Sequence, residues 1–193
     1  MNFNNEYRKA FIEMASSHQW IDPFAVTLTM RWQSWRQHSQ NFRHFMNRLN
    51  TQIHGNAYKR YGRRLSVLPV IEGTHRDHPH YHWVIDNPRS DNRVWFEANI
   101  FKCWNQTELG LPEMSITPEA DIGWIRYMAK PRDKDNYNEA FDWENAWFEH
   151  PDRRWLKCPS NVFSYWSSCC RHWSVSIFKY TKFIKYSKGY SYV

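Results

Sequence analysis

The chain has 193 residues, a formal net charge of +7 and a pI of about 9.3. This length suits one domain with a well-packed core, or one domain with an appendage, and the positive charge favours a polyanionic partner. The sequence shows no signal peptide and no apolar run near 20 residues, so we expect a cytoplasmic protein with reduced thiols and no membrane partner.

Aromatic residues make up 18% of the chain, and 12 of them are Trp. Aromatic rings interleaved with Lys and Arg suit nucleic acids, because the rings stack on unpaired bases while the cations hold the backbone. Packing in the core is the alternative for any single Trp.

The four cysteines form no C-x-x-C pair and no regular framework. Three of them lie near His172 and offer an irregular zinc-binding set, namely Cys158, Cys169 and Cys170. Packed or free thiols are the alternative for these three and for Cys103, and we favour it.

The first part of the chain predicts a helix, a strand and a second helix. Residues 1–22 are partly helical, and residues 24–30 alternate in the manner of a central strand. Residues 39–54 carry apolar side chains at helical spacing and predict an amphipathic helix. A basic, aromatic connector follows at residues 58–64.

The middle of the chain predicts a β-hairpin and a helix. Residues 65–72 and 80–86 are β-rich, and the segment between them is rich in turn residues. Asp91 or Asn92 caps the next helix. Its apolar face is predicted to comprise Val94, Ala98, Phe101 and Trp104.

A fourth strand is predicted at residues 111–116, followed by a helix that starts at Thr117–Pro118 and stops at Pro131. Ile122, Ile125 and Ala129 are expected to face the core of the protein. The missing side chain of Gly123 is expected to leave space beside Tyr127, one turn further along.

The order β-α-β-β-α-β-α is typical of an α+β fold of the ferredoxin-like or RRM-like type, a split βαβ arrangement with a central antiparallel sheet backed by helices. We assign residues 1–131 to this core. Residues 132–193 form an aromatic and basic C-terminal extension that we expect to pack on the same domain. The sequence contains no phosphate-binding Gly-rich loop.

Glu72, His80 and His82 are the candidate metal ligands. On a strand, residues i and i+2 point to the same face, so the two imidazoles lie side by side. Glu72 comes within reach of them if the two strands of the hairpin pair. Two neutral nitrogens and a carboxylate form a three-ligand site with open positions for a divalent ion, its waters and a phosphate oxygen.

Tyr127 and Lys130 lie one helical turn apart and supply a phenolic oxygen and a positive charge. A metal that polarises a phosphate and a tyrosine that attacks it are the parts of a DNA-nicking enzyme. A solvent-exposed helix lysine is the alternative for Lys130. His75 and His78 flank the hairpin turn, where DNA contact, a role beside the metal and simple solvation are the options.

Three motifs occur in order: Thr27-Leu28-Thr29, His80-Tyr81-His82 and Tyr127-x-x-Lys130. Together they resemble the HUH endonucleases, and most closely the one-tyrosine rolling-circle replication initiators (Rep) of small plasmids, filamentous phages and single-stranded DNA viruses. A Glu eight residues before the first His also matches the third metal ligand of viral Rep domains. The motifs cover roughly residues 24–131.

The resemblance implies that Glu72, His80 and His82 hold Mg²⁺ or Mn²⁺ and that Tyr127 attacks a DNA phosphate to form a 5′-phosphotyrosine. It implies single-stranded DNA or an origin hairpin as substrate, in the cell that hosts the plasmid, phage or virus. Because no helicase domain follows, a host helicase and polymerase are expected partners. The oligomeric state is left open.

The candidate DNA-contacting surface is basic, and a solvated basic face is its alternative. It comprises Arg43, Arg48, Lys59, Arg60, Arg63 and Arg64. Two other functions stay open: an HUH transposase of the REP-associated or insertion-sequence type, which shares the motif order, and a non-catalytic nucleic-acid-binding protein with a structural His pair.

Overall fold

The computed structural model describes residues 3–74, 78–131, 134 and 140–148. All of them belong to one unit, Met1–Glu149, and the second unit, His150–Val193, lies outside the described residues. The predictions for the three C-terminal cysteines and for most of the C-terminal extension therefore stay predictions, as does the domain boundary at residue 131.

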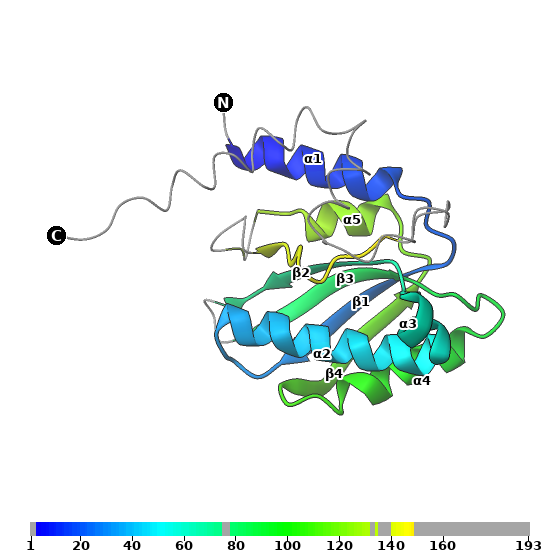
Figure 1. The fold of residues 1–193 in the computed structure, drawn as a ribbon. Coiled ribbons are helices and arrows are strands. Elements are labelled where there is room, and N and C mark those ends of the chain that lie inside the picture. Colours follow the sequence, from blue (N-terminus) through cyan, green and yellow to red (C-terminus); the bar gives the residue numbers. More distant parts are fainter. Residues whose placement is uncertain (1–2, 75–77, 132–133, 135–139, 149–193) are drawn as a thin grey trace. The chain divides into compact units, whose positions relative to one another are not determined.

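A four-stranded antiparallel sheet forms the centre of the described unit, with the strand order β2-β3-β1-β4 (Figure 1). The strands are β1 (Pro23–Met30), β2 (Val67–Glu72), β3 (His80–Asp86) and β4 (Gly110–Pro118). The interior position of β1 confirms its predicted central place. The sheet and the helices on it confirm the expected α+β fold.

One face of the sheet is covered by α2 (Trp35–His54) and α4 (Arg93–Trp104). Alternate residues of β1 point toward these helices, so Phe24, Val26 and Leu28 are buried there. Such alternation is the period of two that places successive side chains on opposite faces of a strand.

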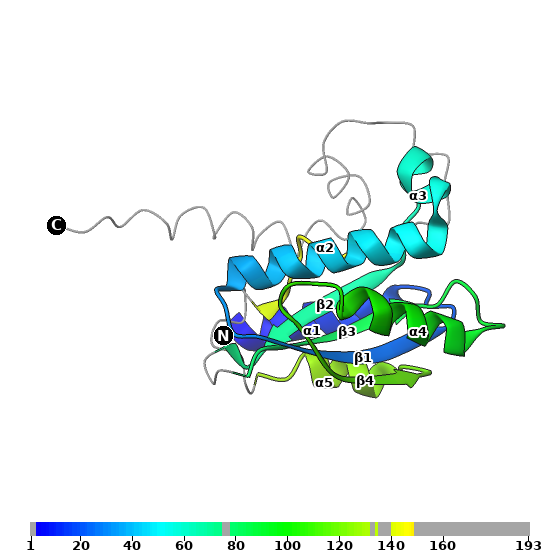
Figure 2. The same cartoon turned by 90° about the horizontal axis from the view of Figure 1, so that it is seen from below.

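The other face carries α1 (Phe3–Ser17) and α5 (Ile122–Met128), which pack on Leu68, Val70 and Val84. Figure 2 shows α2 and α5 on opposite sides of the strands. In β2 and β3, the side chains that alternate with those facing α2 therefore face α5.

Residues 140–148 run along the outer edge of β2, where bridges join Val67 to Trp147 and Val70 to Phe141. This segment covers backbone groups that an edge strand would otherwise expose. Asp142 is fully buried and accepts hydrogen bonds from Ser39 of α2 and from Tyr81 of β3. The carboxylate thus ties the edge segment to both layers.

Two predicted helix starts were wrong. α2 begins at Trp35 because Ser34 and Gln37 form a capping box, four residues before the predicted start. The predicted start at Thr117–Pro118 was wrong because both residues still pair with β1. The last helix begins at Ile122, where Asp121 caps it by accepting from the Trp124 backbone N–H at 3.0 Å.

The predicted apolar face of α4 was wrong in part: Asn92 caps the helix and Trp104 is buried as expected, but Ala98 is exposed. Val94 and Phe101 are 77% and 49% exposed, and the buried face runs instead through Phe96 and Ile100. Ile122 of α5, expected in the core, is 40% exposed. A short helix, α3 (Asn56–Tyr61), replaces most of the predicted connector. Among the described helices, none is both long and apolar enough to cross a membrane.

Candidate metal centre

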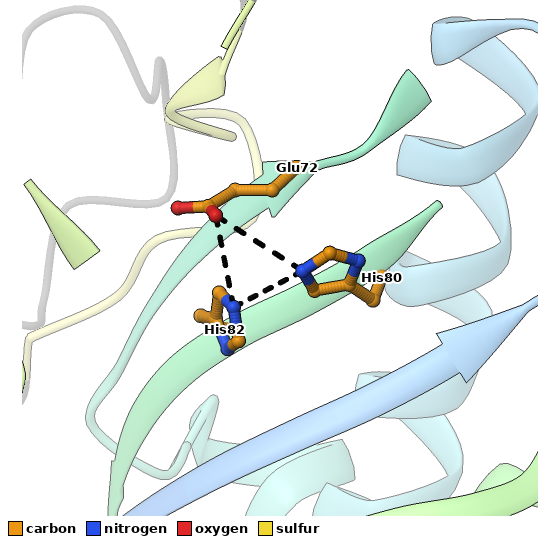
Figure 3. Close-up of side chains that lie close together, drawn as sticks. All are labelled: Glu72, His80 and His82. Atoms are coloured by element: carbon orange, nitrogen blue, oxygen red, sulfur yellow. Dashed lines mark hydrogen bonds and ion pairs between the residues drawn. The ribbon is translucent and has the colours of Figure 1, made fainter. Parts of the chain in front are cut away.

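Glu72, His80 and His82 come together at one end of the sheet, on its α5 side. The β2–β3 register pairs Glu72 with His80, and His82 lies two residues further along the same face. The two Nε2 atoms are 3.1 Å apart, and they lie 4.0 Å (His80) and 3.7 Å (His82) from Glu72 Oε2. Figure 3 shows the carboxylate and both rings pointing toward one another. The candidate ligand atoms thus lie close enough together to bind one metal ion.

The hairpin turn makes this register possible through Gly73. Its φ of +72° is left-handed, and a Cβ at this position would lie 2.3 Å from the carbonyl oxygen of His78. The same carbonyl lies 2.8 Å from Nδ1 of His80. Since a carbonyl only accepts, Nδ1 of His80 donates to it, and this contact directs Nε2 toward His82 and Glu72, where its lone pair would ligate a metal.

His82 is oriented by Thr27, its register partner on β1, whose hydroxyl lies 2.9 Å from Nδ1. When this hydroxyl accepts a hydrogen bond from Nδ1, the lone pair of Nε2 is free for a metal. Burial lowers the pKa of His82 to about 3, and the nearby charges of His80, Lys130 and Lys134 add to this effect. The ring therefore stays in the neutral form that ligates metals.

The spacing fits an octahedral divalent ion. Ligand bonds of about 2.1 Å at right angles place neighbouring ligand atoms about 3.0 Å apart. The two Nε2 atoms already meet this condition, and Glu72 Oε2 has to move about 1 Å closer to His80 Nε2 and somewhat less to His82 Nε2. The donor set of two imidazoles and one carboxylate suits a transition ion such as Mn²⁺ better than Mg²⁺, which prefers oxygen ligands.

Two lysines balance the charge of Glu72, whose side chain is fully buried. Lys134 Nζ donates to Oε1 at 2.5 Å and to the carbonyl oxygen of Lys130 at 2.7 Å. Lys130 Nζ lies 3.1 Å from Oε2. Burial lowers the pKa of Lys130, but its contacts with Tyr127 and Glu72 and the charges of those groups more than offset this, so its pKa lies above the usual value.

Tyr127 stands beside the three candidate ligands. Its ring centroid is 5.0 Å from that of His82, with the rings edge to face, and Lys130 Nζ lies 3.7 Å from the Tyr127 centroid. Trp124 stacks on the Tyr127 ring at 5.2 Å and is fixed in turn by a hydrogen bond from its indole N–H to the carbonyl of Trp83. Tyr127 is 42% exposed, so a polymer in solution has access to it.

Sequence reasoning missed Lys134 and Trp124, which touch the candidate ligand and the candidate nucleophile. It also misplaced the effect of Gly123. A Cβ there would lie 2.9 Å from the Asp121 carboxylate, so this glycine makes room for the helix cap and not for Tyr127. His78 is exposed and contributes its carbonyl, whereas His75 lies outside the described residues.

The structure does not bring the candidate DNA-contacting cations to the metal ligands. Arg43 and Arg48 lie on α2, on the opposite face of the sheet, where Arg43 pairs with Glu144 at 2.6 Å and Arg48 donates to Gln106. The remaining four are exposed on or just after α3, beside the start of β2 and not its Glu72 end; they are Lys59, Arg60, Arg63 and Arg64. A strand of six residues, about 17 Å long, separates the two ends.

The sequence model of the family described as replication-associated protein ORF2 matches residues 23–191. This span includes all five candidate metal and catalytic residues. No curated protein and no solved structure matches the chain.

Proposed function

Because the chain belongs to the replication-associated protein ORF2 family, we propose that it initiates DNA replication as an HUH endonuclease. In this proposal it nicks and rejoins single-stranded DNA at an origin through a covalent bond to Tyr127. The family match favours replication over the alternative of transposition.

The observation that carries the proposal is the position of Tyr127 against the ligand cluster. A phenol, an ammonium and three candidate ligands converge at one point, where Tyr127 is exposed and its ring lies 5.0 Å from that of His82. A structural pair of histidines has no need for an accessible phenol beside it. A nicking enzyme needs a nucleophile next to the ion that activates the phosphate.

Glu72, His80 and His82 would hold Mn²⁺ or Mg²⁺, which supplies positive charge to the non-bridging oxygens of the scissile phosphate. The phenolic oxygen of Tyr127 forms a bond to phosphorus while the bond from phosphorus to the 3′-oxygen breaks. The phenol loses its proton, and the departing 3′-oxygen gains one. The products are a 5′-phosphotyrosine and a free 3′-hydroxyl.

Lys130 and Trp124 prepare Tyr127 for this step. The ammonium beside the ring stabilises negative charge on the phenolic oxygen, and the indole stack limits the orientations of the ring. Since the adduct retains the energy of the broken bond, attack by a 3′-hydroxyl reverses the reaction. The same residues would therefore join strands as well as cut them.

The basic residues on the α2 and α3 side would grip DNA away from the cut. Because they lie at the other end or on the other face of the sheet, they would bind a different part of the DNA from the part that reaches Tyr127. Replacement of Lys59, Arg60, Arg63 and Arg64 by Ala should reduce the salt dependence of binding by about 0.7 log units for each phosphate that the variant no longer neutralises on single strands. An unchanged salt dependence would rule out this phosphate-binding role.

The test of the proposed reaction is a covalent complex. Wild-type protein incubated with single-stranded origin oligonucleotides and Mn²⁺ should yield a protein–DNA band on denaturing gels, and Tyr127→Phe should bind the DNA but yield none. Tyr7→Phe makes the same chemical change in α1 and should retain the band. A band of undiminished intensity from Tyr127→Phe would refute the assignment of the nucleophile.

A further inference from the structure

Two lysines contact different oxygens of the same candidate ligand, and their surroundings differ. We propose that Lys134 is a permanent positioning residue that holds Oε1 of Glu72, whereas Lys130 occupies Oε2 only until a divalent cation binds and then moves to the DNA phosphate beside Tyr127. This inference rests on the proposed metal-dependent function.

Lys134 is buried and held by two hydrogen bonds. Its side chain is fully buried, and its ammonium donates to Glu72 Oε1 and also to the backbone carbonyl of Lys130. The second contact involves no metal ligand, so it does not depend on the charge state of the centre. Both histidines pair with Oε2 of Glu72, whereas Lys134 Nζ contacts Oε1. A cation bound by Oε2 and the histidines would therefore leave the contact of Lys134 intact.

Lys130 stands where the cation would bind. It lies 3.1 Å from Oε2, the oxygen that is 3.7 and 4.0 Å from the two Nε2 atoms. Oε2 is buried and, within the described part of the chain, accepts no hydrogen bond of regular geometry. The ammonium of Lys130 is thus held at Oε2 by an ion pair alone, and a metal ligated by Oε2 and both imidazoles would displace that ammonium.

Once a metal displaces it from Glu72, the ammonium of Lys130 is close to Tyr127, the proposed nucleophile. Its side chain is 23% exposed, and its Nζ already lies over the Tyr127 ring. A phosphate that enters beside the ring offers the released ammonium a new anionic partner. Metal binding and phosphate binding are therefore coupled: the empty centre keeps Lys130 on Glu72, and the loaded centre frees it for the substrate.

The test is the Mn²⁺ affinity of the DNA-free protein, measured by isothermal titration calorimetry. Lys130→Met should bind Mn²⁺ about tenfold more tightly than wild type, because the competing ammonium is removed. Lys134→Met should bind about tenfold more weakly, because the carboxylate loses the group that orients it. Lys102→Met, an exposed lysine of α4, serves as the control and should match wild type.

A second variant separates positioning from charge and from folding. Lys134→Gln keeps a donor for Oε1 without the charge and should retain most of the wild-type affinity. If both Met variants bind Mn²⁺ more tightly than wild type, both lysines only compete with the metal for Glu72, and the proposal is wrong. An unchanged affinity in both variants would also overturn it. If His82→Ala binds Mn²⁺ as tightly as wild type, the metal does not lie at this centre and the proposed function itself fails.

Discussion

Replacement of Glu72 by Gln tests whether the buried carboxylate neutralises the two lysines in the metal-free protein. The substitution keeps the shape of the side chain and one acceptor oxygen, so it removes little besides the charge. Lys134 then remains a fully buried ammonium that keeps the carbonyl of Lys130 but loses its carboxylate partner. Removal of one partner from a buried ion pair costs about 3–5 kcal/mol, and the retained acceptor favours the lower end of this range, about 3 kcal/mol.

For a chain of this length, about 3 kcal/mol corresponds to a decrease in Tm of roughly 6–12 °C. Urea unfolding followed by circular dichroism in EDTA measures the change in the free energy of unfolding directly. Glu113→Gln makes the same charge change at an exposed position of β4 and should stay within about 0.5 kcal/mol of wild type. If Glu72→Gln is as stable as this control, the ion pairs of Glu72 contribute nothing and the reasoning fails.

Two further predictions concern the turn and the acid side of the stability profile. Gly73→Ala places a Cβ 2.3 Å from the carbonyl oxygen of His78 at a left-handed φ, so the turn that orients His80 has to shift. Mn²⁺ binding measured by calorimetry should weaken about tenfold or more, and an unchanged affinity would show that the turn does not orient His80. Burial lowers the pKa of His18 from 6.5 to about 4, so between these two values the unfolded chain binds a proton that the folded chain does not, and stability falls with acid. His18→Leu should flatten this decline in urea titrations at about pH 7 and about pH 4.5, and an equal decline in both proteins would contradict the assignment.

The part of the centre that could be predicted from the sequence depends on local geometry. The period of two along a strand places His80 and His82 on one face, and a short hairpin returns Glu72 beside them, so the triad follows from spacing alone. The spacing of three residues likewise places Lys130 beside Tyr127, although the predicted helix end at Pro131 was wrong: α5 ends at Met128, and Lys130 follows the C-cap, where its backbone N–H donates to the Tyr127 carbonyl. These relations hold whatever the rest of the chain does.

The residues that were missed depend on contacts between distant segments. Lys134 comes after α5 and lies in neither a helix nor a strand, so no periodic pattern predicts its neighbours. Only the folded chain shows that its ammonium contacts Glu72 of β2. The start of α5 was misplaced because Thr117–Pro118 suits a helix N-terminus and equally suits a strand end, and pairing with β1 decides between them. In α4, two apolar stripes run along the helix, and only packing in the core selects the one with Phe96.

The most direct test of the central claim is mass spectrometry of the protein after reaction with a single-stranded origin oligonucleotide. We expect the nucleotide to be attached to Tyr127 when Mn²⁺ is present, and the modified peptide to be absent in excess EDTA and in His82→Ala. Attachment to another tyrosine, or attachment that persists in EDTA, would contradict a metal-dependent nicking centre built from Glu72, His80, His82 and Tyr127.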